Sequence, residues 1–147
     1  KIIKPTLDAL KKKKKPYTGF LYVGLMIKNN EPYLIEYNIR MGDPECQVIL
    51  PRLKTDIVKI FEKSTSDKLI NTKIEWKRKK CMTIVLCAKG YPRRYKKNLV
   101  IKNIDKLKLS KQDYIFHAGT KIVDNELRSN GGRVLNITSV GNSFFFF

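Results

Sequence analysis

The sequence predicts an α+β fold in two parts: antiparallel strands with helices in residues 1–74, followed by a small, mainly antiparallel β region in residues 75–147. Runs rich in β-branched and aromatic residues, separated by short turn segments, predict antiparallel strands in both parts. Apolar residues at helical spacing predict helices in the first part. A basic, polar stretch from Lys73 to Lys80 lies at the boundary.

The first part opens with a predicted helix and a predicted hairpin. Apolar residues recur at helical spacing over residues 2–10, and the helix should run into the lysine block and stop at Pro16. Strands are expected at 19–27 and 32–39, because the paired asparagines between them tolerate the positive φ of a tight turn. The first strand is apolar on both faces, which predicts a covered, central position.

Two helices are expected after the hairpin. A short one begins near Glu45, and a longer one covers residues 55–63. Thr55 can cap the longer helix, Asp56 stands in its first turn, and Ile57 and Ile60 belong to an apolar stripe. These helices complete the first part.

The second part is read as a small β unit. Strands are predicted at 81–88, 114–123 and 133–140, and turn-forming clusters at 124–126 and 130–132 separate them. The paired glycines of the second cluster indicate a hairpin turn and not a phosphate-binding loop, since no strand precedes them and no helix follows.

Charge is the most unusual feature of the composition. The 147 residues include 31 Lys and Arg against 13 Asp and Glu, a net charge of +18, and 24 of the 31 are lysine. Specific nucleic-acid recognition favours arginine, so we expect no specific nucleic-acid partner. A basic RNA- or polyanion-binding module without catalytic activity remains the alternative. The uncharged run 16–27 is too short to cross a bilayer, so no membrane association is expected.

The cysteines and the single histidine are interpreted as structural residues. Cys46, Cys81 and Cys87 lack metal-finger spacing and predict reduced, buried structural thiols in a cytoplasmic protein. The N-terminal residues do not form a secretory signal. His117 lies on a predicted strand without a catalytic constellation, which favours packing or hydrogen bonding.

The segment 34–45 carries the clearest chemical pattern. Alternation along the strand places Glu36, Asn38 and Arg40 on one face and three apolar residues on the other, toward the core. A carboxylate and a carboxamide two residues apart suit magnesium, which fills its remaining positions with water and phosphate. Arg40 could then face the negative charge of a transferring phosphoryl group.

A turn continues this face. Gly42, Asp43, Pro44 and Glu45 combine a permissive glycine, a turn-forming Asp-Pro pair and a helix-starting glutamate. Such a turn can present backbone N–H groups and a carboxylate beside a metal. Alternatively, the polar residues are only the solvent face of an edge strand in a structural β domain without a site.

These residues resemble a known family. The segment 34–45, with the residues 50–53 that follow, resembles the signature region of the phosphoribosylamine–glycine ligases. Residues 17–26 resemble the strand before that signature. The later segments 90–92, 117–120 and 132–135 resemble successive landmarks of that family's C-terminal domain. Met41 departs from the signature, where a Phe or Leu is expected, but this change conserves volume.

The resemblance implies an ATP-grasp ligase of de novo purine (IMP) biosynthesis. In such enzymes ATP activates glycine as an acyl phosphate, and the amine of 5-phosphoribosylamine attacks it to give glycinamide ribonucleotide, ADP and phosphate. Residues 1–74 would be the C-terminal part of the ATP-grasp domain, and residues 75–147 the β-rich C-terminal domain.

The resemblance also implies the roles of single residues. Glu36 and Asn38 would hold magnesium or manganese against the ATP phosphates, Arg40 would be catalytic, and the turn residues Gly42, Asp43, Pro44 and Glu45 would contact substrate. The family's N-terminal domain, glycine-rich loop and adenine pocket would precede Lys1, and the last four phenylalanines would replace a helix and a strand. We therefore expect a monomeric fragment that is inactive by itself.

Overall fold

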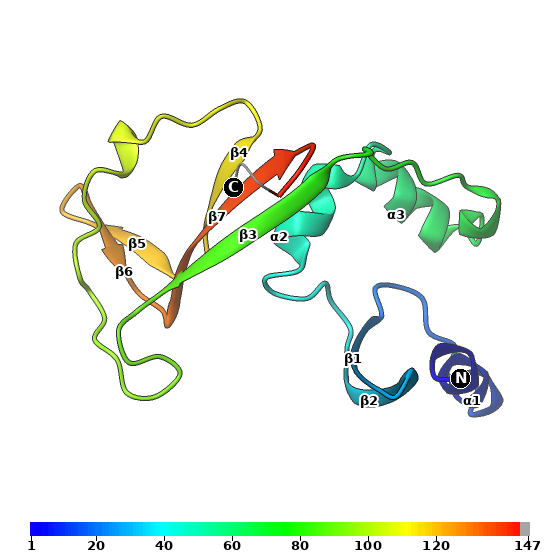
Figure 1. Cartoon of the computed structure of the whole chain (residues 1–147). Coiled ribbons are helices and arrows are strands. Elements are labelled where there is room, and N and C mark those ends of the chain that lie inside the picture. The colour runs from blue at the N-terminus through cyan, green and yellow to red at the C-terminus, as the bar shows by residue number, and fades with distance from the viewer. Residues whose placement is uncertain (145–147) are drawn as a thin grey trace. The chain divides into compact units, whose positions relative to one another are not determined.

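The structure, a computed structural model, describes residues 1–144 (Figure 1). Its contacts divide the chain into two compact units: the first comprises Lys1–Asp43 with Thr55–Glu75, and the second comprises Pro44–Lys54 with the chain from Trp76 onward. Helices combine with antiparallel sheets, which confirms the predicted α+β class. The prediction that the last four phenylalanines replace a helix and a strand concerns mainly residues 145–147, which lie outside the described residues.

Figure 1 labels the helices and strands of the two units. The first unit contains α1 (Ile3–Lys12), β1 (Tyr22–Lys28), β2 (Glu31–Asn38), α3 (Ile57–Thr65) and the 3-10 turn η2 (Leu69–Asn71). The second contains α2 (Cys46–Ile49), η1 (Leu50–Arg52), β3 (Lys80–Cys87), η3 (Ile104–Lys106), β4 (Asp113–His117), β5 (Thr120–Val123), β6 (Glu126–Ser129) and β7 (Arg133–Gly141). None of the helices within residues 1–144 is long and apolar enough to span a membrane.

The end of α1 lies inside the lysine block. Lys14 adopts a left-handed φ of 56°. Its N–H donates to the Lys11 carbonyl at 2.9 Å, and the N–H of Lys15 donates to the Leu10 carbonyl at 3.0 Å. These two bonds form a Schellman motif, which ends the helix before Pro16 is reached. The predicted helix is confirmed, but its end is set by this motif.

Strands β1 and β2 form the predicted antiparallel hairpin. Asn29 and Asn30 take φ values of 51° and 61°, as the tight turn requires. The predicted covered position of the first strand is wrong for the described residues. There β1 pairs with β2 alone, and Ile27 is 60% exposed.

The apolar face of β2 is likewise open. The Tyr37 hydroxyl lies 2.5 Å from the Thr6 hydroxyl of α1, so that helix covers this face at Tyr37. Ile35 and Ile39, predicted to point into a core, are 62% and 76% exposed. That prediction is wrong because no element among residues 1–144 buries these two side chains.

Helix α3 is capped by a residue other than the expected one. Asp56 is the N-cap, and its Oδ1 accepts a hydrogen bond from the Val58 N–H at 2.8 Å. The hydroxyl of Thr55 instead accepts from the Glu75 N–H at 2.7 Å. Thr55 therefore links the first and last residues of segment 55–75. The prediction that Thr55 caps α3 is wrong, and the cap is Asp56.

The second unit is built on a three-stranded antiparallel sheet in the order β3-β7-β4. The central strand β7 supplies the buried apolar residues Val134, Leu135 and Val140. Segment 44–54 joins this unit, since α2 contacts β3 and β7 and the Lys77 N–H donates to the Arg52 carbonyl at 2.8 Å.

The strand predicted at 114–123 is in fact two strands. The N–H groups of Ala118 and Gly119 both donate to the Val134 carbonyl, at 3.1 and 3.0 Å, and the chain turns there between β4 and β5. Strand β5 then pairs with β6 in a separate two-stranded sheet. The sequence reading missed β6, whose first residue it assigned to a turn cluster.

Candidate functional site

Glu36 and Asn38 lie together on β2. The Asn38 Nδ2 donates to Glu36 Oε1 at 3.0 Å, so both side chains occupy one face of the strand, as alternation predicts. Their partners across the hairpin are Gly24 and Tyr22. Glu36 is exposed and Asn38 is half-buried.

Gly24 makes room for the Glu36 side chain. A Cβ at this glycine would lie 3.1 Å from Glu36 Cγ, which is tighter than normal packing. The ladder also has a bulge beside Gly24, where Leu25 pairs with Leu34 and skips Ile35. Sequence analysis did not identify this supporting glycine, because the pairing across the hairpin depends on the bulge.

Arg40 lies beyond the end of β2, so strand alternation does not place it. Its Nη1 donates to the Met41 carbonyl at 2.9 Å, and the residue is exposed. The guanidinium thus folds back on the adjacent backbone and keeps further N–H groups for other acceptors.

The turn that follows joins the two units. Gly42, which is buried, and Asp43, which is exposed, end the first segment of the first unit. Pro44 and Glu45 begin the second unit. The Pro44 carbonyl accepts from the Gln47 N–H at 3.1 Å, and the Glu45 carbonyl accepts from the Ile49 N–H at 3.0 Å. Glu45 thus starts α2, as predicted from its position.

Among residues 1–144, no group of three or more His, Cys, Asp and Glu side chains could hold a metal ion. Glu36 and Asn38 supply two oxygen-bearing side chains, which is the usual protein contribution to a magnesium site completed by water and phosphate. The pair therefore fits a substrate-bound metal better than a structural one.

The thiols differ from their prediction. Cys46 and Cys81 are half-buried and Cys87 is exposed, so the expectation of three buried thiols is wrong. Burial raises the pKa of the Cys81 thiol, and the positive charge of Arg52 opposes that shift. His117 is exposed and its Nδ1 lies 2.9 Å from the Thr120 hydroxyl, consistent with the expected hydrogen-bonding role.

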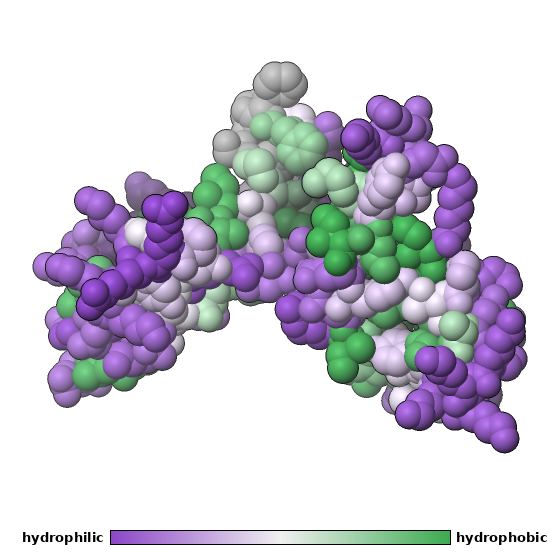
Figure 2. Space-filling model, turned by 90° about the horizontal axis from the view of Figure 1, so that it is seen from below, coloured by the Kyte–Doolittle hydropathy of each residue, from purple (hydrophilic) through white to green (hydrophobic). Residues whose placement is uncertain are grey.

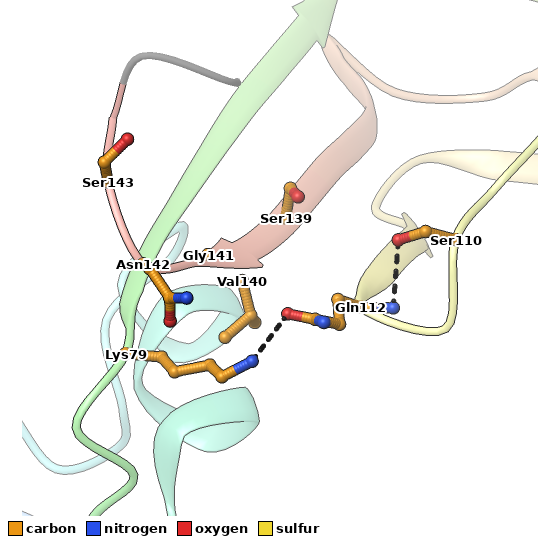
Figure 3. A pocket seen from close by; sticks show the side chains of 8 residues that line it. All are labelled: Lys79, Ser110, Gln112, Ser139, Val140, Gly141, Asn142 and Ser143. Carbon is orange, nitrogen blue, oxygen red and sulfur yellow. Dashed lines mark hydrogen bonds between the residues drawn. The ribbon is translucent and has the colours of Figure 1, made fainter.

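A polar pocket of about 420 Å³ lies at the end of β7 and contains none of the predicted site residues (Figure 3). Lys79 reaches across it, and its Nζ donates to Gln112 Oε1 at 3.0 Å. The Gln112 N–H in turn donates to the Ser110 hydroxyl at 3.1 Å. These bonds tie the start of β3 to the turn before β4.

Asp113 forms a hydrogen-bond network next to this pocket. The Ser139 hydroxyl donates to Oδ1 at 2.5 Å, and the Ser110 N–H donates to Oδ2 at 2.8 Å. The hydrogen bond from Ser139, followed by those from Ser110, lowers the pKa of the Asp113 carboxyl. The network is structural, since it joins β4, β7 and the preceding turn.

Comparison with known families gives two matches on this chain. Residues 1–46 match the family described as phosphoribosylglycinamide synthetase, ATP-grasp (A) domain. Residues 81–145 match the phosphoribosylglycinamide synthetase C domain. Every predicted site residue from Glu36 to Glu45 falls within the first match.

Individual relatives match almost the whole chain. A phosphoribosylamine–glycine ligase of Caldanaerobacter subterraneus subsp. tengcongensis is 43% identical over 144 residues, which are 98% of this chain and 34% of the relative. A trifunctional purine biosynthetic protein adenosine-3 of Gallus gallus is 40% identical over 140 residues, 95% of this chain and 14% of the relative. The chain thus spans about a third, or less, of these relatives.

A solved structure gives the same result. The crystal structure of a phosphoribosylamine–glycine ligase from Thermotoga maritima superposes with a TM-score of 0.71 and 34% identity, over 95% of this chain and 34% of that chain. Two family matches in the right order, relatives near 40% identity and this fold similarity agree with one another. The chain belongs to the phosphoribosylamine–glycine ligase family.

Proposed function

We propose that this chain supplies the metal-binding strand and the C-terminal domain of a phosphoribosylamine–glycine ligase. The reaction would join glycine to 5-phosphoribosylamine at the expense of ATP, through a glycyl phosphate. The observation that carries the proposal is the contact between Glu36 and Asn38 on one face of β2, inside the segment that matches the ATP-grasp domain. The comparisons give no support to the alternative of a nucleic-acid-binding module.

The geometry of the pair suits a magnesium or manganese ion. Octahedral magnesium binds oxygens at about 2.0–2.1 Å, so two neighbouring ligand oxygens lie roughly 2.9 Å apart. A half-turn of the Asn38 carboxamide would place Oδ1 where Nδ2 now lies, 3.0 Å from Glu36 Oε1. When bound, the metal would neutralise charge on the ATP phosphates.

The remaining residues would position the reactants. Arg40 carries a permanent positive charge and unused N–H groups, which would stabilise negative charge on the phosphoryl group as it moves to glycine. The turn of Gly42, Asp43, Pro44 and Glu45 would hold the substrate end of the site. We also propose residues 1–74 and 75–147 as the two family domains.

Metal binding can be tested on the 147-residue chain directly. Mn²⁺ should broaden the NMR signals of Glu36 and Asn38 before those of other residues. Glu36→Gln keeps the shape but removes a formal charge, and it should weaken Mn²⁺ binding by about tenfold or more. Glu62→Gln, an exposed carboxylate on α3, is the matched control and should leave that binding unchanged. Equal loss in both variants would contradict the assigned site.

The ligase reaction requires the rest of the enzyme. We would replace the matching third of the Caldanaerobacter ligase by this chain and measure ADP release that depends on glycine and phosphoribosylamine. The chimera should be active. Glu36→Gln should lower its kcat but leave its melting temperature nearly unchanged, because Glu36 is exposed. An inactive but folded chimera, or a fully active Glu36→Gln variant, would contradict the proposal.

A further inference from the structure

The loop after β3 concentrates positive charge. This cationic loop, residues 89–97, contains five basic residues: Lys89, Arg93, Arg94, Lys96 and Lys97. No Asp or Glu occurs between Glu75 and Asp105 in the sequence. Within residues 1–144, none of the five basic side chains forms an ion pair. Their charge therefore remains available to an external anion.

Both ends of the cationic loop are fixed by backbone hydrogen bonds. At its start, the Ala88 N–H donates to the Gly132 carbonyl at 2.7 Å. At its end, the Asn98 N–H donates to the carbonyl of the buried Ser129 at 2.7 Å, and the Ser129 hydroxyl accepts from the Leu99 N–H at 3.1 Å. The start of the loop is therefore held on Gly132, just before β7, and its end on Ser129 of β6.

Aromatic rings support the loop between these ends. The ring of Tyr91 lies directly against Gly132, at a position where any side chain would collide with it. Tyr95 packs edge-on against Tyr91, with 5.9 Å between ring centroids. Gly90 has a φ of 101°, and a Cβ there would lie 2.5 Å from the Arg94 carbonyl oxygen, so the chain folds back tightly. These contacts restrict the places that the basic side chains can reach.

Part of the loop lines an open surface cavity of about 760 Å³. Its lining is formed by Lys89, Arg94, Tyr95, Lys96 and Leu99. The lining thus combines three cations with a tyrosine ring and a leucine side chain. Arg93 and Lys97 carry the same charges on the same loop but do not line the cavity.

We propose that this cavity binds a small sugar phosphate through its phosphate monoester. Arg94 can bond two phosphate oxygens at once, and the two lysines add charge and donors. Tyr95 and Leu99 form an apolar wall against which a sugar ring can pack. The volume lies in the range of small-molecule sites, about 300–1,000 Å³. A single-stranded nucleic acid would instead require a series of exposed rings for successive bases, and one tyrosine lines this cavity.

The choice of a pentose phosphate rests on the proposed function, because that reaction consumes a phosphorylated ribosylamine. The presence of a phosphate-binding cavity does not rest on that function. A different phosphorylated metabolite would be recognised by the same chemistry, so the experiment distinguishes the ligase substrate from such a metabolite.

The binding test is an NMR titration of the 147-residue chain with ribose 5-phosphate, with ribose as the unphosphorylated comparison. Ribose 5-phosphate should shift the amide signals of Tyr95 and Leu99, and ribose should not. Arg94→Gln should weaken binding by about tenfold or more. Arg93→Gln removes the same charge outside the cavity and should weaken binding less than about twofold.

Three results would overturn the inference: no binding of ribose 5-phosphate, equal weakening by both variants, or tighter binding of a single-stranded oligonucleotide at near-physiological salt. The titration uses neither ATP nor glycine, so a negative titration would not contradict the proposed ligase activity. Likewise, an inactive chimera would not contradict ligand binding in the cavity. In an active chimera, a raised KM for phosphoribosylamine in Arg94→Gln identifies the substrate as the ligand. An unchanged KM, with binding of ribose 5-phosphate still lost, identifies a separate metabolite.

Discussion

At the scale of single residues, Asp113 has the clearest link between geometry and solution behaviour. Its two carboxylate oxygens accept hydrogen bonds from Ser139 and Ser110, and these bonds lower its pKa. The folded protein therefore holds the ionised form more strongly than the unfolded chain does. This contribution to stability is complete above the ordinary Asp pKa of about 3.9 and is lost as the pH falls through the lowered value.

Asp113→Asn should therefore be less stable than the wild type at neutral pH, and the difference should narrow as the pH falls below about 4. Thermal unfolding measured across this pH range checks the expectation. Asp124→Asn, at an exposed turn, is the control and should show no such convergence. A difference between Asp113→Asn and wild type that stays constant with pH would contradict the role of the ionised carboxylate.

Residue-level prediction from the sequence succeeded where strand alternation decides the outcome. Alternation alone puts Glu36 and Asn38 on one face, and their hydrogen bond confirms it. It could not place Arg40, because β2 ends at Asn38. It also could not identify Gly24 as the neighbour of Glu36, since one bulge changes every partner beyond it.

At the scale of elements, the break between β4 and β5 depends on Gly119. A Cβ at Gly119 would collide with the Arg133 carbonyl oxygen and would lie 2.8 Å from the Gly131 Cα. Both obstacles are backbone atoms, which cannot rotate away as a side chain can. Gly119→Ala should therefore lower the free energy of unfolding by about 1–3 kcal/mol.

Urea unfolding measures this loss, with Ala118→Ser at the adjacent exposed residue as the control. A Gly119→Ala variant as stable as the wild type would show that the backbone relaxes at little cost. The break was not predicted because β-branched and aromatic residues typical of strands flank Ala118 and Gly119 on both sides. Its cause is close approach to a segment 12 or more residues away, at Gly131 and Arg133.

Elements with local signals were predicted well. The hairpin follows from Asn29 and Asn30, whose positive φ values are observed. The N-cap of α3 was misassigned by one residue, because Thr55 and Asp56 are both good caps and the choice is made by the distant Glu75 N–H. Tertiary contacts thus decide between two locally acceptable arrangements.

At the scale of the whole chain, burial is uneven between the two units. Among residues 1–144, the buried hydrophobic side chains that form the core are Val134, Leu135 and Val140, all on β7 of the second unit. The hairpin of the first unit has exposed apolar residues on both strands, and apolar side chains are visible at the surface in Figure 2. The sequence predicted these residues as core, since periodicity reports which face is apolar but not what covers it.

This asymmetry predicts different local stabilities for the two units. Amide hydrogen exchange requires local opening, and opening is easiest where few apolar contacts are lost. The amides of β7, paired on both sides by β3 and β4, should exchange slowest. Those of β1 and β2, paired only with each other among the described residues, should exchange at least about a hundredfold faster, a difference of about 2.7 kcal/mol.

Exchange measured by NMR on the 147-residue chain, residue by residue, tests this order. Adding urea below the unfolding midpoint should speed exchange in the hairpin first, since it opens without disturbing the β3-β7-β4 sheet. Lys80–Cys87 serves as the internal reference, because β3 shares the sheet of β7 but lies at its edge. Equal protection of the hairpin and β7 would show that the two units unfold as one, and the core on β7 would then not account for the stability of the chain.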